Sequence, residues 1–351
     1  MGRLKKLMAG ANRWQVKHPW FSLPWAVMTK FNDDQANLLV VALAWYGFTA
    51  IYPLLLVIVT AFGFIGVGSL GSSVVTTLHQ FPVIGAQFTP GNGGSNLHGS
   101  AFGLVIGLVG LLYGAQGVTQ TAQTAINRVW NVPQVDRPGF LPRLGRSTAS
   151  LACIGGAFLI NAFAGSLATS SGRDLMVRVG IVVGQVAINI GLYLASFRLL
   201  LAERAEVETR SLLPGSIAGA VFFTALITVG TGLVEHQLRH QSATYGAFAS
   251  VIGVVAFLLL LAKLTLYSAE LNVVLARRLY PRAFPLTDPL PADTRVLAAL
   301  AHEERRRPDE RIGVGFEPEA MQKVRDDAER TAASDPAGPH DSTREPTRRP
   351  R

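Results

Sequence analysis

Cysteine is almost absent from this chain, which has a single one, Cys153, among 351 residues. One cysteine excludes a disulfide within the chain and a cysteine-based metal site, and its place in an apolar run predicts a small packed residue. The seven histidines are scattered over several loops, which argues against a dinuclear metal cluster. His236 and His240 have a spacing that zinc sites use, but no third ligand set accompanies them. We interpret them as part of an interfacial polar cluster.

Sequence motifs of catalysis are also missing. The chain has no phosphate-binding Walker A loop, no GxSxG nucleophile elbow, no HExxH zinc motif and no paired-cysteine motif. We therefore expect that this protein is not an enzyme and that it uses no cofactor and no metal.

Charged residues are scarce, at 16% of the chain, while 49% of the residues are apolar and the mean hydropathy is +0.31. The apolar residues form long runs, and several runs reach the ~20 residues that a bilayer-spanning helix needs. We predict an all-α polytopic membrane protein with a bundle of six transmembrane helices within residues 38–280. The helices are expected at about 38–66, 101–122, 148–169, 177–200, 213–234 and 246–276, the second with a polar extension to Trp130.

Positive charge is distributed unevenly along the chain. Of the 32 Lys and Arg residues, 28 lie in four segments, 1–37, 123–147, 198–212 and 277–351. Cytoplasmic loops carry such an excess of Lys and Arg, so both termini are expected on the cytoplasmic side, in agreement with an even number of helices. Residues 1–276 hold 17 basic against 9 acidic residues, which suits contact with anionic lipid rather than a nucleic-acid-binding tail.

Three segments flank or interrupt the spanning helices. Residues 1–37 mix basic residues with aromatic ones, which predicts an interfacial or cytoplasmic segment. Residues 67–100 carry no charged side chain, and apolar residues at helical spacing within 74–81 predict a short helix on the outer surface. Residues 281–351 form a Pro/Arg-rich cytoplasmic tail, with a helix expected at 293–307 and disorder after about 330.

Six amides interrupt the second and fourth apolar helices. They are Gln116, Gln120, Gln123 and Asn127 in the second helix and Gln185 and Asn189 in the fourth. Their spacing places the four amides of the second helix on one face, and Arg128 follows at its cytoplasmic end. Amides facing lipid would be costly, so they either bond neighbouring helices together or line a water-filled or substrate cavity. Both interpretations stay open at this point.

Lys263 and Glu270 lie inside the last apolar helix, where a charge costs ~3 kcal/mol or more. They share one face with Tyr267, but they are two turns, or roughly 10 Å, apart. Because helical side chains lean toward the N-terminus of their helix, a direct ion pair is not expected. Each therefore needs a partner on another helix, a water molecule or a ligand. We favour a functional role for Lys263, and leave Glu270 open between a structural ion pair and a functional group.

Two further positions complete the candidates. Asn272 ends the polar set of the last helix, beside Glu270. Pro53 lies in the middle of the first helix, where it removes a backbone hydrogen bond and produces a kink. The kink is either a hinge for a conformational change or a fixed feature of the helix shape.

Four segments carry a resemblance to a known family: "LAWYGFTAIYPLLL" (43–56), "GAQGVTQTAQTAINRVWNVP" (114–133), "TYGAFASVIGVVAFLLLL" (244–261) and "YSAELN" (267–272). Through them the chain resembles the YihY/BrkB family of bacterial inner-membrane proteins, and it is most similar to the YhjD branch. The resemblance covers residues 25–285. It implies six transmembrane helices, both termini inside and a location in the bacterial cytoplasmic membrane.

The resemblance also implies a substrate class. The YhjD branch is linked to the export of lipid A-type glycolipids, and the BrkB name to serum resistance, so envelope lipids or glycolipids are the expected ligands. The first hypothesis is a transporter or flippase with a polar intramembrane cavity. The second is a non-transporting envelope scaffold that docks partner proteins through its tail and outer loop. Formation of a homo-oligomer stays open in both cases. The third hypothesis is a ribonuclease, but the sequence has neither a nuclease metal site nor a basic RNA-binding face. We therefore expect no nucleic-acid partner.

Overall fold

The computed structural model describes residues 2–65, 101–139, 141–150, 175–238, 246–285, 287–316 and 326. Within these ranges the chain is helical and contains no strand. The long helices are α1 (Gly2–Lys17), α2 (Pro19–Asp33), α3 (Ala36–Ile65), α5 (Ala101–Val129), α7 (Leu175–Leu200), α8 (Leu213–Leu238), α9 (Gly246–Ala276) and α10 (Pro291–Glu303). Residues 141–150 are also helical, and short 3-10 turns occupy Gln134–Asp136, Glu203–Ala205 and Thr209–Leu212.

Five of the six predicted apolar helices are helices in the structure, namely α3, α5, α7, α8 and α9. The predicted third helix, 148–169, lies outside the described residues except for 148–150, and the predicted surface helix within 74–81 lies outside them entirely. Three described stretches are long and apolar enough to cross a membrane, Val182–Leu200, Thr209–Ile227 and Val251–Ala276. The part of the chain that the structure describes is thus all-helical and of membrane type.

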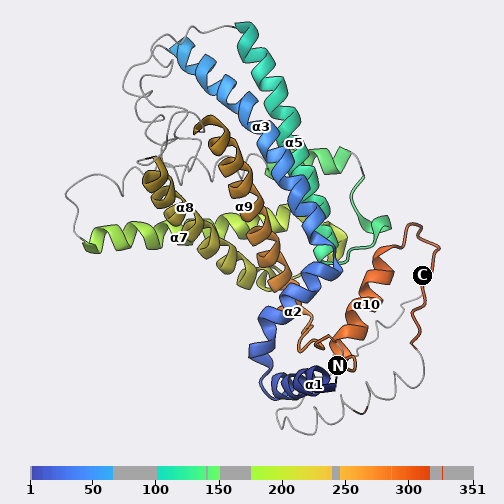
Figure 1. The fold of residues 1–351 in the computed structure, drawn as a ribbon. Helices are drawn as coiled ribbons and strands as arrows, with labels where there is room; N and C mark the ends of the chain where they lie inside the picture. The colour runs from blue at the N-terminus through green and yellow to red at the C-terminus, as the bar shows by residue number, and fades with distance from the viewer. Residues whose placement is uncertain are drawn as a thin grey trace.

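The helices form a bundle in which α3 lies alongside α5 and α9, and α8 packs against both α7 and α9 (Figure 1). At the foot of the bundle, α2 packs against α9, and α1 and α10 lie beyond it. The main core gathers around Trp130, Phe197, Val273 and Val296, which are buried among α2, α5, α7, α9 and α10. The tightest part of the apolar core therefore lies at the foot, where the long helices end.

Glycines bring α3 and α5 into close contact. A Cβ atom added at Gly114 would lie 2.8 Å from the Cβ and 2.9 Å from the Cα of Ala50. A Cβ atom at Gly110 would likewise meet the ring of Pro53, and a Cβ atom at Gly117 would meet the ring of Tyr46. Small residues at this spacing allow the backbones of membrane helices to approach each other, so the sequence of α5 sets the α3–α5 distance.

Gly114→Ala is expected to destabilise the protein by about 1–3 kcal/mol, because the added methyl group meets the backbone of Ala50 and forces the two helices apart. Gly47→Ala in α3 is the matched control, since its Cβ would meet only the side chain of Leu258, at 3.6 Å. Thermal unfolding in detergent compares the two variants. Equal unfolding temperatures would show that the α3–α5 contact is not close-packed.

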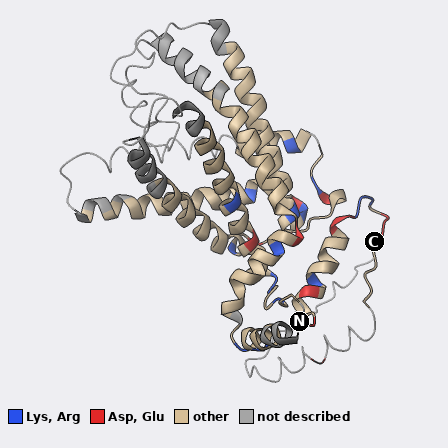
Figure 2. Ribbon diagram, viewed as in Figure 1, with Lys and Arg blue, Asp and Glu red and all other residues tan. Residues whose placement is uncertain are grey.

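Charged side chains gather around the foot of the bundle and the connections there (Figure 2). The sequence of α3 contains no charged residue, and the single one in α5, Arg128, lies in its last turn. Both α3 and α5 are therefore uncharged over most of their length, and the ion pairs among the described residues concentrate at the foot of the bundle.

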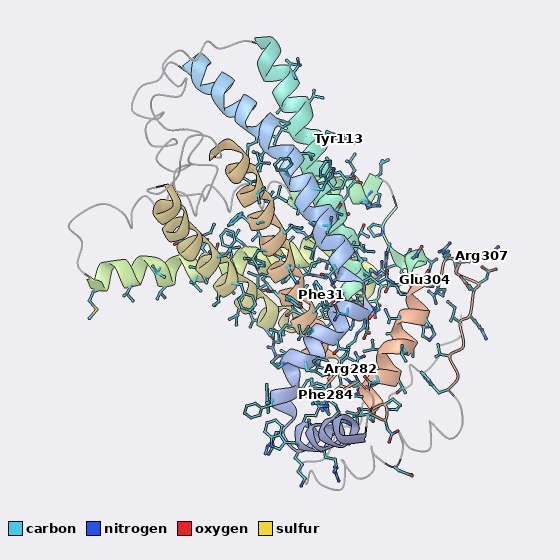
Figure 3. The ribbon with its side chains drawn as sticks, in the orientation of Figure 1. Phe31, Tyr113, Arg282, Phe284, Glu304 and Arg307 are labelled. Atoms are coloured by element: carbon cyan, nitrogen blue, oxygen red, sulfur yellow. The ribbon has the colours of Figure 1, made fainter. Side chains whose placement is uncertain are left out.

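The beginning of the C-terminal tail is part of the folded unit. The predicted helix at 293–307 is α10, which begins at Pro291 and ends at Glu303, so the run Arg305–Arg307 follows the helix rather than closing it. Arg282, between α2 and α10 in Figure 3, binds Asp33 at 2.8 Å and Asp293 at 2.5 Å. Val296 is completely buried in the main core. The tail after about residue 330 lies outside the described residues.

Candidate functional site

A cavity of about 330 Å³ lies at the centre of the bundle. Five helices line it: α3, α5, α7, α8 and α9. Its lining residues are Leu43, Ala44, Gly47, Val118, Ala122, Ile126, Asn189, Leu192, Tyr193, Ser196, Phe197, Leu200, Phe223, Leu258, Leu261, Ala262, Thr265 and Leu266. Nearly all of these side chains are apolar, so the wall suits hydrocarbon rather than a charged group.

Three of the four polar side chains in the cavity wall, Asn189, Tyr193 and Thr265, form hydrogen bonds between the helices around the cavity. The Tyr193 and Thr265 hydroxyl groups share a hydrogen bond of 3.2 Å, which joins α7 to α9. The Asn189 amide donates to the Thr224 hydroxyl at 3.3 Å, which joins α7 to α8. These bonds leave little free polarity in the cavity, and its shape is held by contacts between its own walls.

A buried charge cluster, formed by Lys30, Asp34 and Glu270, lies where α2 meets α9. All three side chains are completely buried. The Lys30 ammonium lies 2.5 Å from Asp34 Oδ2 and 3.7 Å from Glu270 Oε2, and it also donates to the Val129 carbonyl at 3.0 Å. The charge cluster thus ties the N-terminal segment to the ends of α5 and α9.

The charge cluster lies close to the cavity. Leu266 lines the cavity, and Glu270 follows it four residues later on α9, which is a rise of roughly 6 Å. Phe31, next to Lys30, stacks on Tyr267 with ring centroids 4.3 Å apart. The apolar cavity is therefore followed, about one helical turn toward the foot, by a layer of buried charge.

Three of the four amides on this face of α5 bond to protein groups, and none of the four is among the residues that line the cavity. The Gln116 side chain bonds to Ser147 and to Thr148, the latter at 3.1 Å, and the Gln123 amide donates to the Arg143 carbonyl at 3.2 Å. Asn127 donates to the Leu200 carbonyl at 3.1 Å and accepts from the Ala202 backbone N–H at 2.8 Å. These bonds favour the interhelical interpretation for Gln116, Gln123 and Asn127, and both interpretations stay open for Gln120.

Asn127→Leu is expected to destabilise the protein by about 2–4 kcal/mol, because the buried Ala202 N–H and Leu200 carbonyl both lose their partner. Gln120→Leu is the matched control on the same face, since the Gln120 side chain makes no hydrogen bond within the described ranges; it should change stability by less than about 0.5 kcal/mol. Unfolding in a denaturant series measures both. A smaller effect at Asn127 than at Gln120 would contradict this assignment.

The other sequence candidates are placed separately from one another. Asn189 lines the cavity, whereas the side-chain Oδ1 of Asn272 accepts a hydrogen bond from the Gly215 backbone N–H at 2.6 Å and joins α9 to α8. Lys263 is half-buried, with its ammonium 6.0 Å from the centre of the Tyr267 ring, and forms no ion pair with another described residue. Gln185 lies on α7, and Arg128 has a buried Nε without a hydrogen-bond partner in the described part of the chain.

Pro53 lies inside α3, which continues as a helix from Ala36 to Ile65. Its ring packs against Gly110 of α5. The Thr49 hydroxyl donates to the Tyr46 carbonyl at 3.0 Å, within the turn before the proline. The hinge role of Pro53 stays a prediction.

Sequence reasoning missed Lys30 and Asp34, the partners of Glu270. One signal was available: Asp33 and Asp34 are two of only four acidic residues among the first 200, and they stand directly before an apolar run. An acidic pair at that place is unusual in a segment that is otherwise basic. Its position next to Lys30 indicates a local ion pair, but nothing in the spacing points to Glu270.

Comparisons with known proteins give one match. The family model described as virulence factor BrkB matches residues 27–288, about three quarters of the chain. The matched range includes the five cavity helices and all three residues of the charge cluster. Searches among curated proteins and among solved structures gave no match. The chain belongs to the BrkB virulence factor family.

Proposed function

We propose that this protein moves an envelope lipid or glycolipid across the bacterial inner membrane, as a YhjD-like member of its family. The observation that carries the proposal is the cavity at the centre of the bundle, about 330 Å³ in volume, with walls from five helices. Its volume is within the range of ligand sites, and its apolar wall matches an acyl chain.

The proposed topology has six membrane-spanning helices with both termini in the cytoplasm. The distribution of Lys and Arg supports this topology, as does the gathering of charge at the foot of the bundle (Figure 2). On this orientation the charge cluster lies toward the cytoplasm and the cavity nearer the bilayer centre. In this proposal the protein is not an enzyme and uses no cofactor. The movement of the lipid is therefore driven by an ion gradient, by a partner protein or by the lipid gradient itself.

The route of the headgroup differs from the one expected at first. The amides of α5 are used in bonds to residues 143–148 and 200–202, which leaves them poorly placed to receive a ligand. Lys263 is the better candidate, because it is half-buried, follows the cavity residue Ala262 and has no carboxylate partner within the described ranges. We propose that its ammonium attracts the phosphate of a lipid whose acyl chain occupies the cavity.

A scaffold function is the second candidate. It is favoured by the docking of the tail, in which Glu303 binds Arg137 at 2.7 Å and Asn131 at 3.0 Å, and Arg305 binds Asp136 at 3.1 Å. These contacts hold α10 and the residues after it against the foot of the bundle, where a cytoplasmic partner of the envelope machinery would meet them. On this hypothesis the cavity has no ligand.

Reconstitution in liposomes tests the two candidates. The purified full chain is expected to raise the rate at which a fluorescent phospholipid or glycolipid changes leaflet, compared with protein-free liposomes. A chain lacking residues 317–351 should retain that rate, because the described residues that line the cavity all lie between Leu43 and Leu266. The scaffold function would be supported instead if liposomes containing the intact chain exchanged lipid no faster than protein-free liposomes, and if removal of residues 317–351 abolished the function of the protein in cells.

A further inference from the structure

The charge cluster is unbalanced. Lys30 supplies one positive charge, whereas Asp34 and Glu270 supply two carboxyl groups, and all three side chains are completely buried. The two carboxyl groups face the same ammonium, at 2.5 and 3.7 Å, and are close enough to act on each other. Two ionised carboxylates so placed repel each other, and one ammonium compensates only one of them, so full ionisation of this cluster would be costly.

The hydrogen bonding of the charge cluster is also incomplete. With both carboxyl groups ionised, three of their four oxygens form no hydrogen bond with a described residue, namely Asp34 Oδ1, Glu270 Oε1 and Glu270 Oε2. The Asn131 amide lies near Asp34 and acts on it, but it donates to Glu303 at 3.0 Å. The Lys30 ammonium bonds to Asp34 and to the Val129 carbonyl, and it is too far from Glu270, at 3.7 Å, for a good hydrogen bond. A proton on Glu270 would give it a donor toward Asp34 and would balance the charge at the same time.

Among the described residues, only Lys30 forms an ion pair with Asp34 or Glu270, and Arg128, the single charged residue of α5, pairs with neither. The sequence of α3 has no charged residue, and in α8 the single one is Glu235, near the far end of that helix. Arg277, just after α9, acts on Asp34 electrostatically, but its guanidinium donates to the Trp130 carbonyl at 2.7 Å and forms no ion pair with a described residue. Asp33 on α2 is bound to Arg282, and Lys263 is two turns away on α9.

We propose that Asp34 and Glu270 form a proton-binding site, in which the two carboxyl groups hold one exchangeable proton between them beside the Lys30 ammonium. Closely spaced carboxyl groups in a buried place commonly share a proton in this way. Burial raises the pKa of Asp34, and the nearby Lys30 ammonium opposes that shift. The site joins α2 to α9, so loss of the proton leaves an uncompensated charge at that contact. The proposal goes beyond lipid movement and does not depend on it.

Infrared difference spectroscopy on the purified full chain tests the proposal. Spectra are recorded in H₂O and D₂O as the pH rises from about 5 to about 9, where exposed Asp and Glu residues, with pKa values of about 4, are already ionised. The wild type should show one carboxylic-acid C=O band that shifts in D₂O and is lost as the proton leaves. Glu270→Gln and Asp34→Asn should each lack this band, because each variant leaves one carboxylate balanced by Lys30.

Glu303→Gln is the control, since Glu303 is a buried carboxylate with its own partner in Arg137, and this variant should keep the band. Circular dichroism confirms that each variant is folded, and the two single variants can be judged separately if one of them fails to fold. Absence of the band from the wild type, or its retention in a folded Glu270→Gln or Asp34→Asn protein, would overturn the proposal. Because no lipid movement is measured, a failure here is distinct from a failure of the transport proposal.

Discussion

Ala122→Phe is expected to reduce leaflet exchange of lipid to the rate of protein-free liposomes. Ala122 on α5 faces the cavity, where its small side chain leaves room between α3, α7 and α9. A phenyl ring at this position would fill a large part of about 330 Å³ and exclude an acyl chain. The ring enters existing space, so we expect at most a small change in stability, well below the about 1–3 kcal/mol of an overpacked core. The flipping assay in liposomes measures the rate.

Val109→Phe is the matched control for this experiment. Val109 lies on the same helix, but its side chain is 63% exposed and faces away from the bundle. A phenyl ring there adds the same bulk on the outer surface and should leave the rate unchanged. If both variants move lipid as fast as the wild type, the cavity is not on the path of the lipid.

Lys30→Met is expected to cost about 3–5 kcal/mol of stability, the largest effect on folding that we predict. Methionine keeps most of the length of the side chain and removes its charge. Asp34 then loses its ammonium partner at 2.5 Å, and the Val129 carbonyl loses its donor, both in a completely buried place. Thermal or denaturant unfolding in detergent measures the loss. Lys17→Met, at an exposed site at the end of α1, is the control and should have little effect.

A second substitution separates loss of charge balance from loss of packing. If Glu270 already carries a proton, Asp34 is the one charge left uncompensated by Lys30→Met. Adding Asp34→Asn should then recover most of the lost stability, although both ion-pair partners are gone. A double variant that is as unstable as Lys30→Met alone would contradict this account of the charge cluster.

The apolar helices could be predicted closely because their signal is local. The last helix was expected at 246–276 and is α9, Gly246–Ala276, and the polar extension of the second helix toward Trp130 is the final part of α5. Each of these depends on a run of apolar residues whose ends are marked by polar or turn-forming residues. The resemblance to the BrkB family was also readable in the sequence, and the family match agrees with it.

The site could not be predicted in the same way, because it depends on contacts between distant segments. Lys30 and Glu270 are 240 residues apart, so no periodicity relates them. The spacing of Gln116, Gln123 and Asn127 correctly placed them on one face of a helix, but it could not show whether that face meets water or the backbone of residues 143–148 and 200–202. Arg282 and Asp293 likewise dock a segment whose proline-rich sequence indicates a loose tail.

Photo-crosslinking with a phospholipid that carries a diazirine at the end of its acyl chain tests the central claim most directly. In reconstituted wild-type protein, mass spectrometry should find labels on cavity residues such as Tyr193 and Leu261, as well as on Val183, which is exposed on the outside of α7. In Ala122→Phe the labels on the cavity wall should be lost while the label on Val183 remains. Labels confined to Val183 and other outward-facing residues in the wild type, or cavity labels that Ala122→Phe leaves unchanged, would contradict the account.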